Sequence, residues 1–337
     1  MELPGDHLRT VFSDNAEFFA IISLNPLKSI ERIDRELTIS VYDQKLQSLY
    51  RLKRTLYYDR SLPLAELSAI DGSLVLGEND TGDLYFYNHT GQLLRQVSLF
   101  PDADYDLEKV LYADFSADGG NMAVVAAKRG NSPRGSSAPN SDSESHIFLF
   151  NTDGEEQWRK RLPEQSTSGV VISPDGQYMA AACYTIAMDG ILTQKTVIFD
   201  NRGSQQGETD LMFKRARFSP HSDLLILADN QHVRLVNIPA ATVMWNKTYP
   251  RQEGMITALD VTSGGYRSVL LTAQNDWTGN FFIFRKPSLI IVDKSGNIVH
   301  TQSFLDREFI EPALLLSEDS GEVSIGFENA LQIFRMP

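Results

Sequence analysis

A short turn signal recurs seven times along this chain, each time directly after an apolar run. In its clearest form it reads Ser-x-Asp-Gly, as at Ser116–Gly119 and Ser173–Gly176. The seven signals begin at Ser13, Ala69, Ser116, Ser173, Ser219, Thr262 and Ser317. Successive starts are 56, 47, 57, 46, 43 and 55 residues apart, a spacing typical of four-stranded propeller blades rather than of helical repeats or βαβ units. The recurrence predicts an all-β fold, a seven-bladed β-propeller of four-stranded antiparallel blades.

The third repeat shows how one unit is built. Its four strands are predicted at Val110–Phe115, Asn121–Ala127, His146–Asn151 and Glu155–Leu162. The first three are apolar, as expected for strands that are covered on both faces, and the fourth is rich in charge, as expected for an exposed edge. In the turns, Asp can accept backbone N–H bonds while Gly adopts a positive φ. We therefore expect a structural role for the turn aspartates Asp71, Asp118, Asp175 and Asp319.

The length of 337 residues is compatible with one domain, because β repeat folds often reach this size as a single unit. We expect one domain over residues 1–337. Its blades are predicted at residues 7–54, 64–99, 110–163, 169–211, 213–249, 255–304 and 310–337. Residues 129–145 are rich in Ser, Pro, Gly and Asn and almost free of apolar groups, which predicts a mobile insertion.

Charge and cysteine content limit the classes of partner. The formal net charge is −13 and the pI is about 4.9, whereas phosphate binding needs clustered Lys and Arg, so a nucleic-acid partner is not expected. No apolar run approaches the roughly 20 residues that cross a bilayer, so membrane insertion is not expected. The single cysteine, Cys183, lies in an apolar run. An internal disulfide is therefore excluded, and a cysteine-based metal site is not expected.

Three features make the chain similar to bacterial members of the WD40-like and PQQ-like β-propeller superfamilies. They are Ser173–Gly176, the strand-end pattern Phe150–Trp158, and Trp245 at the matching place in the fifth repeat. The resemblance covers nearly the whole chain and implies a propeller fold. The tryptophan recurs in only two repeats and no Trp-Asp or Gly-His signature recurs, so the resemblance implies no particular activity, and no cofactor is expected.

The last repeat differs from the others. It offers strands at Ile310–Leu316, Glu322–Phe327 and Ala330–Arg335 but no fourth strand. Either this blade is incomplete or the N-terminus closes it, although Pro4-Gly5 within Met1–Asp6 would interrupt a pairing run. The pattern favours removal of residues upstream of Met1 from a longer precursor, and with it a periplasmic or exported protein. A cytoplasmic location is the alternative.

Function is expected on the blade face that carries the long individual loops, because binding residues concentrate on loops held by a rigid scaffold. The second-to-third-strand insertion at Asn275–Arg285 is the richest in aromatic residues. We expect Trp277, Phe281, Phe282 and Arg285 to bind a protein, peptide or glycan partner, since aromatic residues and Arg are the usual interface anchors. The alternative is an extra hairpin that buries its aromatic residues on the blade. The protein is expected to be a monomer.

The competing interpretation is an enzyme, such as a lactonase-like hydrolase, with a site at the mouth of the central channel. Propeller active sites are assembled from single residues on different blades and leave no linear motif. Asp80, Asn230 and Asn275 are the polar candidates, because each ends a predicted second strand. Nucleophile-elbow, phosphate-loop and metal-ligand spacings do not occur, so the sequence names no catalytic or metal-binding residue and favours a non-catalytic module.

Overall fold

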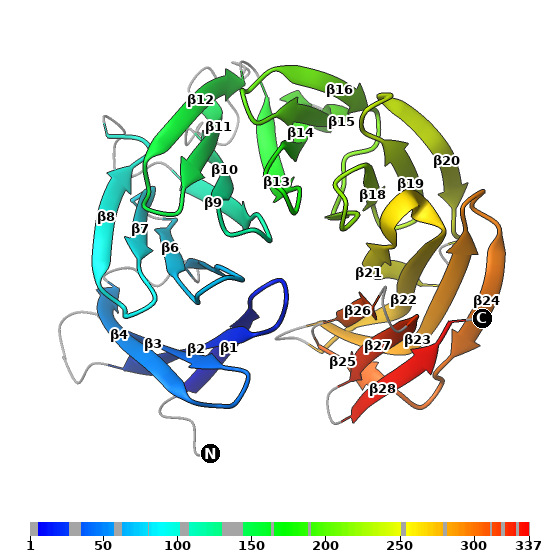
Figure 1. Cartoon of the computed structure of the whole chain (residues 1–337), viewed down its shortest axis with the longest axis horizontal. Coiled ribbons are helices and arrows are strands. Elements are labelled where there is room, and N and C mark those ends of the chain that lie inside the picture. The colour runs from blue at the N-terminus through cyan, green and yellow to red at the C-terminus, as the bar shows by residue number, and fades with distance from the viewer. Residues whose placement is uncertain are drawn as a thin grey trace. The chain divides into compact units, whose positions relative to one another are not determined.

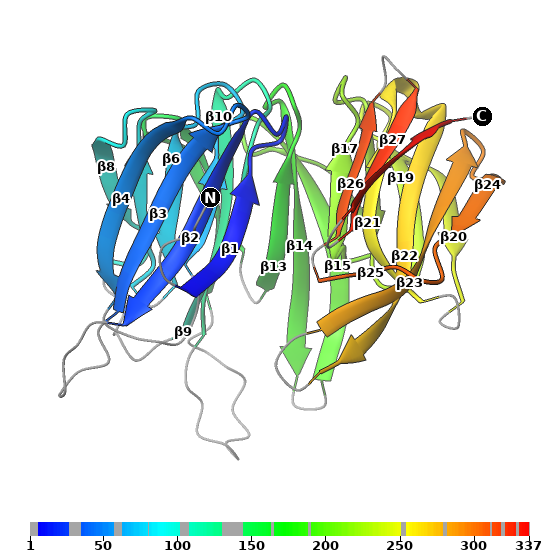
Figure 2. The same cartoon turned by 90° about the horizontal axis from the view of Figure 1, so that it is seen from below.

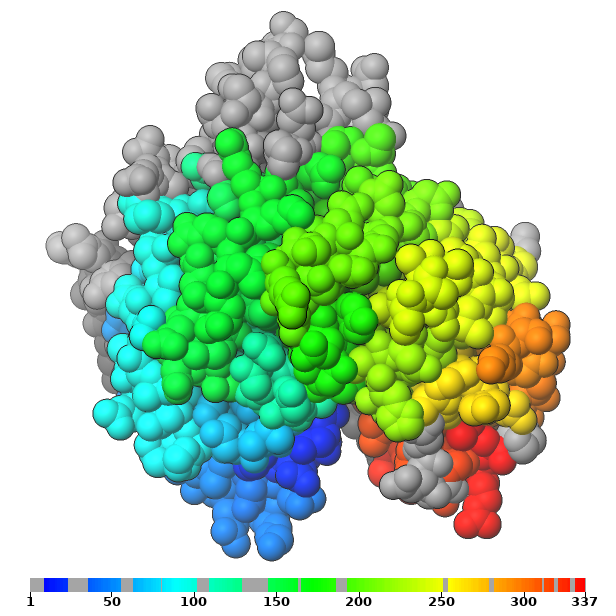
Figure 3. All heavy atoms as spheres, turned by 45° about the horizontal axis from the view of Figure 1, so that its top comes forward, coloured from blue at the N-terminus to red at the C-terminus, as the bar shows by residue number. Residues whose placement is uncertain are grey.

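The protein is all-β in its computed structural model, which describes residues 6–26, 35–56, 63–79, 81–101, 108–129, 144–162, 165–187, 190–250, 254–278, 282–310, 312–317, 321–327 and 330–336. The chain forms two compact units. One comprises residues 1–193 and 201–203, and the other comprises residues 194–200 and 204–337. Within each unit, successive sheets lie side by side, as the ordered change of colour across the surface in Figure 3 shows.

The N-terminal half of the chain forms four antiparallel sheets of four strands each (Figure 1). The first contains β1 (Asp6–Phe12), β2 (Phe18–Pro26), β3 (Arg35–Asp43) and β4 (Ser48–Leu56). The second contains β5 (Leu64–Leu67), β6 (Leu74–Glu78), β7 (Asp83–Tyr87) and β8 (Leu93–Ser98). The third contains β9 (Glu108–Phe115), β10 (Asn121–Arg129), β11 (Glu144–Asn151) and β12 (Glu156–Leu162). The fourth contains β13 (Ser166–Ile172), β14 (Tyr178–Ala187), β15 (Gly190–Asp200) and β16 (Gln205–Thr209).

Three further sheets follow. The fifth contains β17 (Arg215–Phe218), β18 (Leu224–Ala228), β19 (His232–Asn237) and β20 (Thr242–Thr248). The sixth contains β21 (Met255–Val261), β22 (Arg267–Trp277), β23 (Phe282–Asp293), β24 (Ile298–Ser303) and the short β25 (Glu308–Phe309), with the 3-10 turn η2 (Ser263–Gly265) between β21 and β22. The seventh contains β26 (Ala313–Ser317), β27 (Glu322–Phe327) and β28 (Ala330–Arg335).

This order confirms the predicted fold class, an all-β propeller of seven antiparallel blades. In every blade the strands pair in chain order, except that the short β25 pairs with β23. The last blade has three strands among the described residues, whereas β1 pairs with β2 in the first blade. The chain divides into two compact units. This division does not test the prediction of a single domain, which stays a prediction.

Side-chain hydrogen bonds stabilise the recurrent serine turn, as at Ser116. The Ser116 hydroxyl donates to Asp118 Oδ1 (2.6 Å) and accepts from the Asn121 N–H (2.9 Å). Asp118 Oδ1 also accepts the Gly120 N–H (2.9 Å). In the second blade the equivalent residue is Ser68, one position before the predicted start at Ala69, because the Ser68 N–H bonds the Ser73 carbonyl across the turn. The turn aspartates Asp71, Asp118 and Asp175 accept backbone N–H groups as expected, and Asp319 lies outside the described residues.

The turns between third and fourth strands connect adjacent blades through glycine. Gly296, in the turn after Asp293, has φ +78°, and a Cβ added to it would lie 3.0 Å from Cγ and Cδ2 of Trp245 in the preceding blade. Gly203 is placed in the same way over Trp158. The two tryptophans that recur in the sequence are therefore the surfaces on which the glycine turns of the next blade rest.

Buried residues lie on both faces of the blades. Strand β18 is buried at all five positions. Leu224, Ile226 and Ala228 pack in one cluster with residues of the sixth sheet such as Ile256 and Leu270. Because side chains alternate along a strand, the intervening Leu225 and Leu227 face the opposite way. Each inner strand consequently contributes to two cores, one on each side of its sheet.

Part of the insertion predicted at Asn275–Arg285 is strand, because β22 extends to Trp277 and β23 begins at Phe282. The two strands pair along this stretch. This pairing bonds backbone N–H and C=O groups that an irregular loop would have to satisfy in another way. Of the predicted mobile insertion at 129–145, residue 129 and residues 144–145 belong to strands and residues 130–143 lie outside the described residues.

The contact between Gly296 and Trp245 is testable by adding one methyl group. We expect Gly296→Ala to lower the free energy of unfolding by about 2–4 kcal/mol, because the left-handed backbone disfavours Ala and the methyl group overlaps a buried indole. Gly321 has φ +62° with no atom within 4 Å of its added Cβ, so Gly321→Ala is a control for the backbone effect alone, at about 1 kcal/mol. Urea unfolding measures both, and equal losses would contradict the packing role.

Candidate functional site

The sixth sheet carries a hairpin that extends beyond the blade. Pairing of β21 with β22 ends at Ala273, and pairing of β24 with β23 ends at Ser288. Residues Gln274–Trp277 of β22 and Phe282–Arg285 of β23 continue to pair with one another. Figure 2 shows the ends of β22 and β23 reaching past the other strands of their sheet. We call these two segments the arm.

Two backbone irregularities set the arm apart from the blade. The register of β22 and β23 shifts between Thr272 and Gln274. On the other strand, Lys286 has a left-handed backbone with φ +50°, and its N–H donates to the Arg307 carbonyl (3.2 Å). Such bulges bend a strand and redirect its side chains. The alternation of faces in the blade therefore does not continue unchanged into the arm.

One face of the arm is aromatic. Cross-strand partners share a face, and the register places Trp277 opposite Phe282, and Phe284 opposite Phe309 of β25. The Trp277 and Phe282 rings are 4.8 Å apart, and the Phe284 and Phe309 rings are 5.3 Å apart. These four side chains, Trp277, Phe282, Phe284 and Phe309, form what we call the aromatic strip.

The aromatic strip goes from buried to exposed toward the tip of the arm. Phe309 is 1% exposed and belongs to the core of the sixth sheet, with Phe284 packed against it. Trp277 and Phe282 are 55% and 49% exposed. The alternative of a hairpin with buried aromatic residues thus describes the base of the arm but not its tip.

The opposite face of the arm is charged. Arg285 Nε lies 3.6 Å from Asp276 Oδ2 and 3.7 Å from Glu308 Oε2. All three side chains are about half-exposed, so each pair contributes at most about 1 kcal/mol. Of the four residues predicted to bind, Trp277 and Phe282 lie together on the aromatic face, Arg285 lies on the charged face, and Phe281 is outside the described residues.

The alternative channel-mouth residues Asp80, Asn230 and Asn275 stay a prediction, and the structure describes two of them. Asp80 lies outside the described residues. The Asn230 carbonyl accepts the Ile256 N–H (3.0 Å), a bond between neighbouring sheets. Asn275 is a strand residue of the arm, opposite Phe284, rather than the end of a second strand. The sequence did not predict that β22 and β23 stay paired beyond Thr272.

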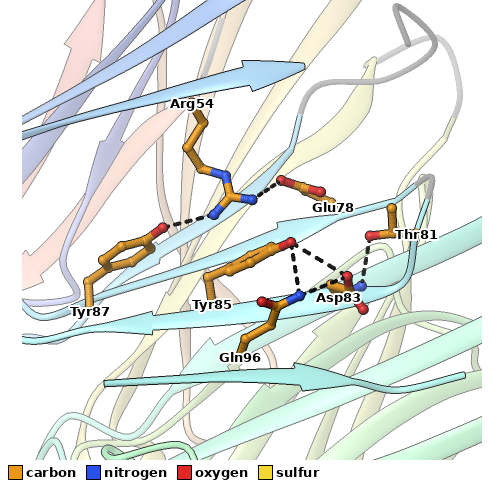
Figure 4. A network of polar contacts seen from close by, with 7 residues as sticks. All are labelled: Arg54, Glu78, Thr81, Asp83, Tyr85, Tyr87 and Gln96. Carbon is orange, nitrogen blue, oxygen red and sulfur yellow. Dashed lines mark hydrogen bonds and ion pairs between the residues drawn. The ribbon is translucent and has the colours of Figure 1, made fainter. Parts of the chain in front are cut away.

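A second polar group, not anticipated from the sequence, connects the first two sheets (Figure 4). Arg54 Nη2 lies 2.7 Å from Glu78 Oε1, and Arg54 Nη1 donates to the Tyr87 hydroxyl (3.0 Å). The guanidinium carbon lies 3.6 Å from the centroid of the Tyr85 ring. The Arg54 and Glu78 side chains are only 23% and 17% exposed. Arg54 belongs to an outer strand rich in charge, which is why its sequence context indicates an exposed residue.

This group continues to the edge of the second sheet. Gln96 Nε2 donates to Asp83 Oδ2 (3.2 Å) and to the Tyr85 hydroxyl (3.4 Å). Burial, with the Glu78 carboxylate, raises the pKa of Tyr85 to about 12. Burial also raises the pKa of Glu78, against the opposing effect of Arg54. The Tyr85 hydroxyl therefore stays protonated at neutral pH. Arg54, Glu78, Tyr85 and Tyr87 connect the two sheets, and we call this group the clamp.

Carboxylates on first strands make a repeated contact between blades. Asp114, two residues before Ser116, accepts the Ile172 N–H of the next sheet (2.8 Å). Asp260 accepts the Leu316 N–H in the same way (3.0 Å). Glu66 occupies the corresponding place in β5, two residues before Ser68. Removal of its carboxyl group from solvent raises the pKa of Glu66 to about 8, with Arg9 opposing and Asp14 adding to the shift.

In the described part of the chain, no group of three or more His, Cys, Asp or Glu side chains is placed to hold a metal ion. Nor does that part contain a helix long and apolar enough to cross a membrane.

Comparison with known proteins shows the fold. No family model matches the chain, and no curated protein matches its sequence. Among solved structures 905 chains match. One of them, described as the structure of the Dos1 propeller, has a TM-score of 0.55 and 10% sequence identity over 98% of this chain and 92% of that one. At this identity the likeness shows a β-propeller and nothing finer.

The clamp predicts energetic coupling between Arg54 and Glu78. We expect a double-mutant cycle with Arg54→Met and Glu78→Gln to give a coupling of about 1–2 kcal/mol in urea unfolding, within the range for contacting polar residues. The exposed pair Arg95 and Glu155, 3.4 Å apart, is the control and should couple by less than about 0.5 kcal/mol. A coupling of zero at Arg54 and Glu78 would show that the clamp contributes no stability.

Glu66 predicts a pH-dependent stability. Its folded pKa of about 8 exceeds the unfolded value near 4.5, so between these values the folded state holds a proton that the unfolded state has lost. Stability is therefore lost as pH rises through this window. We expect the melting temperature of Glu66→Gln, relative to the wild type, to rise by at least about 3 °C from pH 5 to pH 9. The exposed Glu17→Gln should show no such trend, and a flat difference for Glu66→Gln would contradict the shift.

Proposed function

We propose that this protein is a non-catalytic binding module that engages a protein or peptide partner through the arm of the sixth sheet. The observation that carries the proposal is the exposed pair Trp277 and Phe282 at the end of an aromatic strip whose base is buried. Exposed aromatic residues held on a rigid scaffold are typical anchors of binding energy.

The geometry of the arm supports binding rather than chemistry. The strip presents two large rings on paired strands, so little conformational entropy is lost when a partner covers them. The charged residues Asp276 and Arg285 of the arm and Glu308 of β25 contact one another on the opposite face. These charges therefore lie away from the aromatic face.

The family resemblance and the class of ligand are also part of this proposal. The similarity to bacterial WD40-like and PQQ-like propellers is compatible with a binding role and points to no particular activity. A glycan is the other ligand class that exposed Trp and Phe side chains would suit. The paired-strand arm favours a polypeptide, because such an arm offers backbone groups as well as rings.

Removal of the two exposed rings tests the proposal. We expect Trp277→Ser with Phe282→Ser to reduce partner capture from native lysate at least tenfold, since anchor residues typically contribute 2 kcal/mol or more each. Quantitative mass spectrometry of proteins retained by the full chain measures this loss. Thermal unfolding should remain within about 2 °C of the wild type, because the side chains are about half-exposed.

Tyr266 supplies the matched control. It is 66% exposed and lies in the turn between β21 and β22, at the opposite end of β22 from the arm. Tyr266→Ser should leave capture unchanged. Equal capture by the wild type and the double variant would refute the arm as the binding site.

A further inference from the structure

The arm has one covered edge and one open edge. Strand β25 pairs with β23 through Phe284–Phe309 and Arg285–Glu308. On the other side, β21 stops at the pair Met255–Ala273. Among the described residues, no strand pairs with the outer edge of β22 at Gln274–Trp277, although Gly254 lies against the backbone of Ala273 and Gln274. All four residues of the segment are exposed.

Such an edge presents unused backbone groups. In antiparallel pairing, alternate residues direct their N–H and C=O groups away from the partner strand. Either Gln274 and Asp276 or Asn275 and Trp277 therefore offer two donors and two acceptors outward. The segment contains no Pro or Lys, the residues that usually protect an edge from further pairing.

The two faces of the arm define the side chains that an added strand would need. On the aromatic face it would lie beside Asn275 and Trp277, with Phe282 one strand further across, and the exposed Trp277 ring requires an apolar residue. On the charged face it would lie beside Asp276, where two carboxylates share the single guanidinium of Arg285. That excess of negative charge is complemented by Lys or Arg.

We infer that the open edge of β22 at Gln274–Trp277 binds an extended peptide segment of a partner protein, which pairs as an additional strand and alternates apolar with basic side chains. The inference rests on the proposed binding function of the arm and specifies its ligand. Strand addition at a free sheet edge is a common mode of peptide recognition, with affinity from main-chain bonds and specificity from alternate side chains.

A displayed library of random twelve-residue peptides tests the inference on the full chain. Selection should enrich peptides in which an apolar residue and Lys or Arg alternate. Their affinity should fall at least tenfold for Trp277→Ala, whereas Tyr266→Ala should have no effect. Asp276→Asn should weaken peptides with basic residues by about threefold or more and leave uncharged analogues unchanged.

Backbone methylation of a selected peptide separates strand addition from side-chain binding. Strand pairing predicts that N-methyl groups at alternate positions weaken binding at least tenfold and that those at the intervening positions do not. It also predicts slower hydrogen exchange at residues 274–277 in the complex. Peptides that need Trp277 but show neither alternation nor slowed exchange would overturn strand addition and leave the proposed function intact. Failure to select any peptide that depends on Trp277 would overturn strand addition, and the lysate experiment would then decide the proposed function separately.

Discussion

Burial of both faces of each blade is the constraint on which the rest of this structure depends. Strand β18 shows it in its simplest form, since all five of its residues are buried and successive side chains enter different cores. A sheet of this kind is stable only when another layer covers each face. The outer strands, such as β8, are exposed at most positions, so no further layer covers them.

The contacts between neighbouring sheets follow from the same constraint. Glycine turns rest on aromatic rings of the preceding blade, as Gly296 does on Trp245. First-strand carboxylates such as Asp114 accept a backbone N–H of the next blade. Arg54 inserts a charge between two sheets and is accommodated by Glu78 and two tyrosines. The carboxylate and arginine contacts give a polar group a partner where two apolar faces meet. The glycine turns have no side chain at this place, which leaves room for the aromatic ring.

The arm is a part of the described chain in which this constraint is relaxed along a continuous strip of aromatic residues. At Phe309 the aromatic strip still belongs to a core, and at Trp277 it is exposed. A bulge and the left-handed Lys286 mark the transition. An apolar surface that continues out of a core without cover is costly in water, which is the physical reason to assign it a partner.

The sequence by itself determined the blades, their order and the turns, because these depend on local signals. A serine hydroxyl and an Asp carboxylate bond backbone groups within five residues, and Gly supplies the positive φ, so the pattern at Ser116 is legible without its neighbours. The sequence also indicated the aromatic residues near Trp277 as unusual. Only the tertiary structure decided that Trp277 lies opposite Phe282, because the register of the hairpin sets which residues share a face. Alternation along β23 then puts Arg285 on the other face. The tertiary structure alone revealed the clamp at Arg54 and the desolvated carboxyl group of Glu66, because desolvation of a charged side chain is decided by residues from another sheet that are distant along the chain.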